Sequence, residues 1–90
     1  MGILSDETLL IFPCQYPIKI MGRAGKNFRS VAMELLEANV GEISEEAIAT
    51  SLSNKGNFLS LTVTIRADSK QQLDNLYRDL STHDEVLFVL

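Results

Sequence analysis

A glycine-bearing turn between two alternating segments constrains the fold of this chain more than any other feature. Asn54, Lys55 and Gly56 form the turn, and residues 58–67 then alternate between apolar and polar side chains. Such a turn, flanked by period-two patterning, is typical of a β-hairpin. The sequence therefore predicts two antiparallel strands, covering residues 45–53 and 58–67.

The register of this hairpin is also predicted by its turn. An even-length turn pairs Leu52 with Leu59 and Ile48 with Val63, which places both apolar sets on one face of the sheet. A shift of one residue would divide these side chains between the two faces. We therefore expect the even register.

Two further strands are predicted at the ends of the chain. Pro13 and Pro17 keep the early backbone extended and disfavour a helix, so a strand is predicted over residues 16–24. An acidic turn leads to the apolar residues 86–90, which form the last strand. Residues 1–14 precede the first strand as an N-terminal leader.

Helical spacing of apolar residues predicts two helices. The first begins at Asn27 as N-cap and ends at Asn39 or Gly41. The second begins at Ser69, which forms a capping box with Gln72. Their apolar stripes consist of Phe28, Val31, Ala32, Leu35 and Leu36 in the first, and Leu73, Leu76, Tyr77 and Leu80 in the second.

The resulting order is strand-helix-strand-strand-helix-strand, which is typical of the α+β class. It predicts a ferredoxin-like βαββαβ two-layer sandwich with both helices on one face of an antiparallel sheet. Right-handed crossovers favour the strand order 4-1-3-2. A chain of 90 residues has room for one domain, residues 1–90. We expect the helices to cover Ile18, Ile20, Ile48, Leu52, Leu59, Leu61, Val63 and Ile65.

The charge balance and the single cysteine limit the classes of function. Eight basic and twelve acidic side chains give a net charge of −4, which disfavours binding to nucleic acid or to anionic membranes. No targeting segment or membrane span is evident in the sequence. One cysteine, Cys14, excludes an internal disulfide and suits a reducing compartment. The sequence therefore predicts a cytoplasmic protein.

The sheet face away from the helices is the first candidate site. Hydroxyls, cations and a few apolar side chains are expected there, and exposed apolar clusters often mark association. The alternative is an ordinary solvated face of an antiparallel sheet. We predict a surface for a protein partner or for self-association, and the expected interface residues are Lys19, Met21, Thr62, Leu87 and Val89.

The loop between the first strand and the first helix is the second candidate site. Two glycines, two cations and an adjacent helix N-terminus are the ingredients of an anion-binding loop. The alternative is a simple strand-to-helix turn. We predict a site for a small anionic metabolite, formed by Gly22, Arg23, Gly25, Lys26 and Asn27.

The sequence offers less support for catalysis than for binding. The only histidine, His83, lies in an acidic turn, and its distance in sequence from Cys14 matches no metal-site spacing. No catalytic residue, metal or cofactor is therefore predicted. The segment 22–29 is loosely similar to the phosphate loop of acylphosphatases, which share this fold. That resemblance would give Arg29 a phosphate-binding role and Asn54 a water-positioning role.

Two motifs resemble the small bacterial YbeD-like family of uncharacterised proteins. They are the segments 12–22, with Phe12-Pro13 and Tyr16-Pro17, and 53–60, and the similarity extends to residues 86–90. The resemblance implies a fold similar to ACT regulatory domains, which often bind effectors near the first strand-to-helix loop. We therefore predict a regulatory or adaptor module acting in trans. An acylphosphatase-like hydrolase and a structural subunit of a larger complex are the alternatives.

Overall fold

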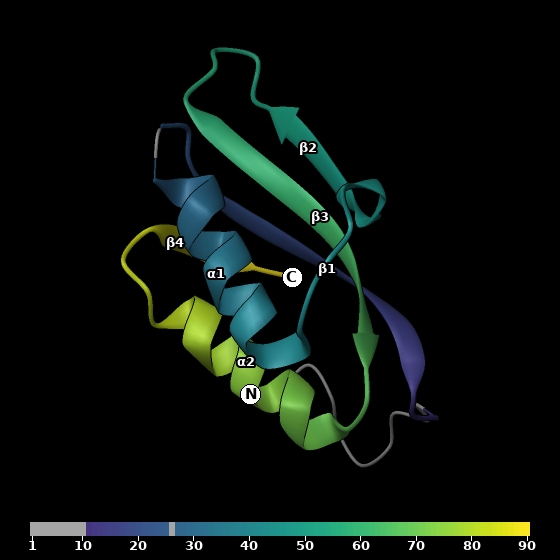
Figure 1. Cartoon of the computed structure of the whole chain (residues 1–90). Helices are drawn as coiled ribbons and strands as arrows, with labels where there is room; N and C mark the ends of the chain where they lie inside the picture. Colours follow the sequence, from purple (N-terminus) through teal and green to yellow (C-terminus); the bar gives the residue numbers. More distant parts are fainter. Residues whose placement is uncertain (1–10, 26) are drawn as a thin grey trace.

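Two helices pack on one side of a four-stranded sheet in the computed structural model, which describes residues 11–25 and 27–90 (Figure 1). The predicted leader therefore lies mostly outside the described residues, as does Lys26. The elements, in chain order, are β1 (Cys14–Arg23), α1 (Phe28–Val40), the 3-10 turn η1 (Glu45–Ala47), β2 (Ile48–Leu52), β3 (Phe58–Ala67), α2 (Lys70–Ser81) and β4 (Val86–Val89).

The strand order in the sheet is β2-β3-β1-β4, and all three pairings are antiparallel. Read from the opposite edge, this is the predicted order 4-1-3-2. The two long strands, β1 and β3, form the centre of the sheet, and the two short strands form its edges. The architecture is that of a ferredoxin-like α+β fold, as the sequence predicts.

The predicted hairpin register is confirmed. Leu52 lies opposite Leu59 and Ile48 lies opposite Val63. The second strand is shorter than predicted, because the turn η1 occupies its first residues. There the backbone N–H of Ile48 donates to the Glu45 carbonyl oxygen, so the regular strand begins only at Ile48.

The first strand begins earlier than predicted. Cys14 and Gln15 already pair with Ala67 and Arg66 of β3, so both belong to the sheet, and Cys14 does not belong to the leader. The long β1–β3 ladder supplies most of the helix-covered face. Buried side chains from both helices and all strands except β2 form one core, which consists of Ile18, Ile20, Phe28, Ala32, Leu36, Leu61, Val63, Ile65, Ala67, Leu73, Leu76, Leu80 and Val86.

Leu52 is a correction to the predicted core. Its side chain faces the helix side of the sheet, opposite Leu59, yet it is 61% exposed. The tip of the β2–β3 hairpin extends beyond the ends of both helices, as Figure 1 shows. The covering layer is therefore too short to bury this leucine, although the alternation places it on the correct face.

Hydrogen bonds at Asn39, near the C-terminal end of α1, join the two helices. Asn39 of α1 donates from Nδ2 to the Asp79 carboxylate of α2 at 3.1 Å. Gln72 of α2 donates from Nε2 to the Asn39 carbonyl oxygen at 3.1 Å. The predicted cap of α2 is confirmed, since the Ser69 hydroxyl accepts from the Gln72 N–H at 3.1 Å. Gly41 ends α1 with a φ of 84°, a backbone conformation that favours glycine.

Candidate functional site

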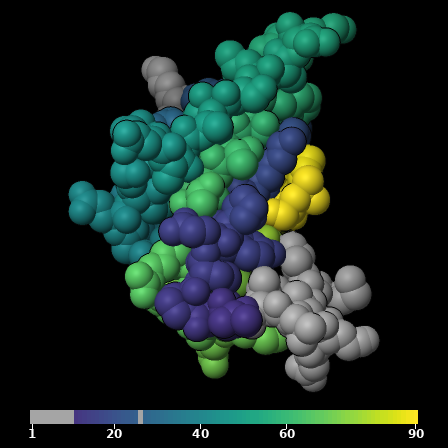
Figure 2. All heavy atoms as spheres, turned by 90° about the vertical axis from the view of Figure 1, so that its right-hand side faces the viewer, coloured from purple at the N-terminus to yellow at the C-terminus, as the bar shows by residue number. Residues whose placement is uncertain are grey.

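The sheet face away from the helices carries a distinct set of side chains. In Figure 2 the strands lie next to one another in the order teal, green, dark blue and yellow, and the β2–β3 hairpin projects at the top. Strand parity and register define what we call the open sheet face. It consists of Gln15, Pro17, Lys19, Met21 and Arg23 of β1, Ala49 and Ser51 of β2, Phe58, Ser60, Thr62, Thr64 and Arg66 of β3, and Phe88 of β4.

The open sheet face is cationic, whereas the chain as a whole is acidic. Lys19, Arg23 and Arg66 all belong to it, and no Asp or Glu does, while the net charge of the chain is −4. Within residues 11–25 and 27–90, Arg66 alone among these three cations has a carboxylate partner. Its Nε lies 3.0 Å from Asp68 Oδ1, just beyond the end of β3, in a pair that is largely exposed. Exposed pairs of this kind contribute little and exchange readily with other anions.

Apolar side chains lie beside these cations. Lys19 pairs with Thr62, Met21 with Ser60, and the Phe88 side chain lies across from Met21 on the neighbouring strand. Phe88 is 45% exposed. A surface that combines cations, hydroxyls and exposed apolar groups suits a partner that presents both carboxylates and apolar side chains.

Two of the predicted interface residues are placed differently from expectation. Val89 pairs with Ile20, which is fully buried beneath the helices, so Val89 lies on the helix-covered face and packs against the core. Leu87 is 44% exposed but is the extra residue where the β1–β4 register shifts. This bulge reverses the alternation of β4, which places Phe88 instead of Leu87 opposite Met21.

The predicted loop site is only partly brought together. Arg23 still belongs to β1, where its guanidinium lies over the Phe58 ring, 5.9 Å from the centroid. Asn27 occupies the N-cap position of α1, but its side chain makes no capping hydrogen bond. Gly25 is exposed with open space around it, and Lys26 lies outside the described residues. Anion binding at this loop stays a prediction.

Gly22 has a packing role that the sequence analysis missed. It is a buried residue of β1, and a Cβ built on it would lie 2.6 Å from Phe28 Cγ. Real Cβ atoms essentially never approach so closely. The absent side chain therefore makes room for the first buried residue of α1, which is a requirement of the fold and not of a ligand.

The structure shows the surroundings of the two residues to which the acylphosphatase-like interpretation gives a role. Arg29 Nη2 lies 3.2 Å from Glu45 Oε1, so the guanidinium already has a carboxylate partner. Asn54 lies in the turn of the β2–β3 hairpin. His83 accepts the backbone N–H of Glu85 on Nδ1 at 3.1 Å. No group of three or more metal-ligating side chains occurs among the described residues.

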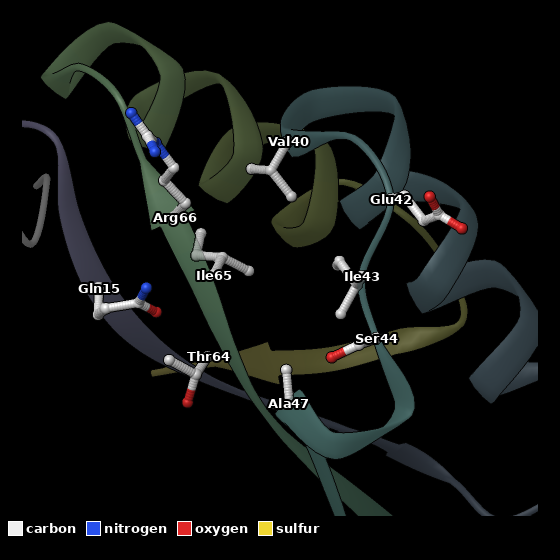
Figure 3. A pocket seen from close by; sticks show the side chains of 9 residues that line it. All are labelled: Gln15, Val40, Glu42, Ile43, Ser44, Ala47, Thr64, Ile65 and Arg66. Carbon is white, nitrogen blue, oxygen red and sulfur yellow. The ribbon is translucent and has the colours of Figure 1, made fainter.

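A hollow of about 240 Å³ lies between the segment after α1 and the end of β3 (Figure 3). Val40, Ile43 and Ile65 form its apolar centre, while Glu42 and Arg66 lie on opposite sides. The hollow lies near the start of β1, whereas the Gly22–Asn27 loop lies at the other end of that strand. None of the residues named for the two predicted sites lines it, but Gln15, Thr64 and Arg66 of the open sheet face do.

The Tyr77 phenol has a pKa that departs clearly from its usual value. Burial raises the pKa of the Tyr77 phenol, and the neighbouring Tyr16 hydroxyl adds to this effect. Tyr77 Oη donates to the Leu90 carbonyl oxygen at 3.2 Å. The Leu90 carbonyl also accepts the Lys19 N–H, at 3.1 Å. Tyr77 therefore joins α2 to the place where the C-terminal segment pairs with β1, which is a structural role.

Comparison with known proteins identifies the family. A family model described as "Protein of unknown function (DUF493)" matches residues 7–90. The chain belongs to the DUF493 family. This confirms the resemblance to YbeD-like proteins. DUF493 membership assigns no activity, and nothing in the comparisons indicates a specific one.

Bacterial relatives match nearly the whole chain. A UPF0250 protein of Janthinobacterium sp. (strain Marseille) is 45% identical over 84 residues, which cover 93% of this chain and 92% of the relative. A UPF0250 protein of Neisseria gonorrhoeae is 35% identical over 86 residues, covering 96% and 94% of the two chains. This DUF493 chain therefore aligns with these relatives over nearly the full length of each.

A solved structure supports the same fold. The solution structure of HP0495 from H. pylori is similar to this DUF493 chain with a TM-score of 0.75 at 21% sequence identity, covering 100% of this chain and 94% of the other. At that identity the likeness concerns the fold. Among the described residues, no helix combines the length and apolar character that crossing a membrane requires.

Phe58 and Phe88 are the aromatic residues of the open sheet face that sequence analysis missed. The signal for Phe58 is present in the sequence, because it shares the parity of Ser60 and Thr62 on β3. For Phe88 no local signal exists. Its face depends on the bulge against β1, which involves two segments more than sixty residues apart in the chain.

Proposed function

We propose that this protein is a regulatory or adaptor module that binds an acidic protein partner through its open sheet face. The observation that supports the proposal is the charge of that face. Lys19, Arg23 and Arg66 share this face with exposed apolar side chains, and among the described residues only Arg66 has a carboxylate beside it, that of Asp68 just beyond the strand end. Complementary charge steers a partner and fixes its orientation, while apolar contacts supply affinity.

The charge of the whole molecule indicates the class of partner. Non-specific nucleic-acid binding requires a protein that neutralises many phosphates, whereas this chain carries a net charge of −4. A protein segment with a few carboxylates and apolar side chains matches the three cations and Phe88 better. The single cysteine supports a site of action in the reducing cytoplasm.

The regulatory part of the proposal draws on fold analogy. The βαββαβ order and the strand order β2-β3-β1-β4 are shared with ACT regulatory domains, which bind effectors in the enzymes that they regulate. In the proposed function the module acts on a separate protein, in trans.

Site-specific photo-crosslinking in living bacteria tests the proposal. A photoreactive amino acid is placed at Thr62, which is exposed at the centre of the open sheet face. The matched control carries it at Gln71, which is exposed on α2 in the opposite layer. We expect a discrete protein adduct from position 62 only, and its loss when Lys19→Glu is introduced.

Three results would contradict this function. They are equal adducts from the two positions, an adduct that survives the charge reversal at Lys19, and an adduct made of nucleic acid. The crosslinked protein, identified by mass spectrometry, should present a cluster of Asp or Glu at the crosslinked segment.

A further inference from the structure

The strand β2 leaves half of its backbone groups without a partner in the sheet. The N–H of Ser53 donates to the Phe58 carbonyl oxygen, so the backbone groups of Ser53, Ser51 and Ala49 point toward β3. By alternation, those of Thr50 and Leu52 point away from the sheet. Among residues 11–25 and 27–90, no hydrogen bond to these outward groups is present.

The usual devices that protect a sheet edge do not occur in β2. Its residues include no charge and no proline, and its pairing with β3 shows no bulge. The opposite edge differs, because β4 contains the bulge at Leu87 and is preceded by Asp84 and Glu85. The edge of β2 is therefore better suited than the edge of β4 to pair with another strand.

We propose that two copies of this chain associate through β2, antiparallel and about a two-fold axis at Thr50. Each four-stranded sheet then continues into the other. In this register Thr50 lies opposite Thr50 of the second copy, and Leu52 lies opposite Ile48. The Thr50 pair exchanges two hydrogen bonds, and each Leu52 N–H donates to an Ile48 carbonyl oxygen.

The charges at the two ends of β2 favour this register and favour a second copy of the chain as the partner. The acidic residues Glu45 and Glu46 precede β2, and the cation Lys55 lies beyond its other end. Antiparallel pairing about Thr50 brings the acidic turn η1 of one copy next to the hairpin turn with Lys55 of the other, at both ends of the interface. Parallel pairing would bring like charges together. The strand is therefore complementary to itself, which is the requirement for a two-fold symmetric contact.

The same arrangement also covers the exposed side chain of Leu52. Leu52 and Ile48 both face the helix side of the sheet, and Leu52 is 61% exposed because neither helix reaches it. Opposed side chains on paired strands lie within contact distance. Pairing would cover Leu52 with Ile48 of the second copy, so the feature that is unfavourable in the monomer becomes part of the interface.

The dimer extends the proposed function without depending on it. Side-by-side pairing leaves all helices on one side and joins the two open sheet faces on the other. The cations Lys19, Arg23 and Arg66 would then occur twice on one surface, with Ala49 and Ser51 at the join. A purified chain dimerises in this way without any other partner, so the two proposals fail independently.

Measurement of molecular mass against protein concentration is the first test. We expect sedimentation equilibrium to show a rise from 10.0 kDa toward twice that mass in the high micromolar range. Leu52→Asp should keep the monomer mass throughout. The matched control Leu87→Asp alters another exposed leucine, on the opposite edge, and should dimerise like the unchanged chain.

Charge exchange tests the register. Lys55→Glu should weaken the dimer at least several-fold at low salt. Adding Glu46→Lys should recover part of that loss, because residue 46 lies next to Glu45 at the same end of the interface. Glu46 is used because Glu45 also contacts Arg29. Thr50→Pro removes one outward N–H, which an edge strand tolerates, and should abolish dimerisation while circular dichroism stays unchanged.

Disulfide trapping tests the geometry directly, in a Cys14→Ser background. Opposed residues of a hydrogen-bonded antiparallel pair have Cα atoms about 5.5 Å apart, within the range of a disulfide. We expect Thr50→Cys to crosslink to itself, and Leu52→Cys to crosslink only with Ile48→Cys. A monomer at every concentration, a dimer unaffected by Leu52→Asp, or equal trapping through Phe88→Cys would overturn the proposal.

Discussion

Gly22 of β1 lies directly against the ring of Phe28, the first residue of α1. A methyl group at residue 22 would come within 2.6 Å of the Phe28 Cγ atom. Both residues are buried, and the glycine lies within β1, where the pairing with β4 shifts register, instead of in a flexible turn. The strand and the helix after it are therefore joined by steric fit across the intervening loop.

We expect Gly22→Ala to lower the free energy of unfolding by about 1–3 kcal/mol, the usual cost of overpacking a core. Gly25→Ala is the matched control, because nothing lies within 4 Å of its Cβ position, and it should change stability by less than about 0.5 kcal/mol. Urea denaturation measures both. Combining Gly22→Ala with Phe28→Leu should cost less than the sum of the two, and strict additivity would refute the contact.

The link between the helices should be measurable as a coupling. Asn39 donates to the Asp79 carboxylate and to the Leu35 carbonyl oxygen, at 3.1 and 2.9 Å. Since hydrogen bonds to charged groups contribute about 1.5–3 kcal/mol, we expect Asn39→Ala to destabilise by about that amount. Asn75→Ala, which removes an exposed contact with Arg78, should be nearly neutral. A double-mutant cycle of Asn39→Ala and Asp79→Ala that shows no coupling energy would argue against the hydrogen bond between these two side chains.

Stability should fall at alkaline pH because of Tyr77. Burial raises its pKa in the folded protein, with a further contribution from Tyr16, so the folded state holds the phenolic proton more tightly than the unfolded chain does. The stabilisation is present below the unfolded pKa of about 10 and is lost progressively above it. Tyr77→Phe should reduce the slope of stability against pH in that range. Denaturation midpoints of the unchanged protein and of Tyr77→Phe, measured at several pH values, give the two slopes. Identical slopes would show that Tyr77 is not the group responsible.

Two leucines on the same face of the sheet should respond very differently to truncation. Leu61 is fully buried, and Leu61→Ala should cost about 2–5 kcal/mol. Leu52 is 61% exposed, and in dilute solution Leu52→Ala should cost less than about 1 kcal/mol. Thermal or chemical denaturation at low micromolar concentration distinguishes them. Comparable losses would mean that the helical layer reaches the hairpin tip.

Much of the candidate site could be read from the sequence, but not all of it. Lys19, Met21 and Thr62 lie on the open sheet face as their alternation predicts. Val89 does not, because one extra residue in β4 reverses the parity of the remaining strand residues. Such a bulge depends on contacts between the two ends of the chain and leaves no local pattern.

The amino-acid sequence by itself determined the order of the elements, the hairpin register and the end of α1 at Gly41. These features depend on neighbours in the chain, where alternation, spacing and turn chemistry act directly. Only the tertiary structure decided that Leu52 is exposed, that Arg23 lies over Phe58 and that Gly22 makes room for Phe28. Each of these depends on how far one layer extends over another or on which distant segment lies alongside, and local patterning carries no information about either.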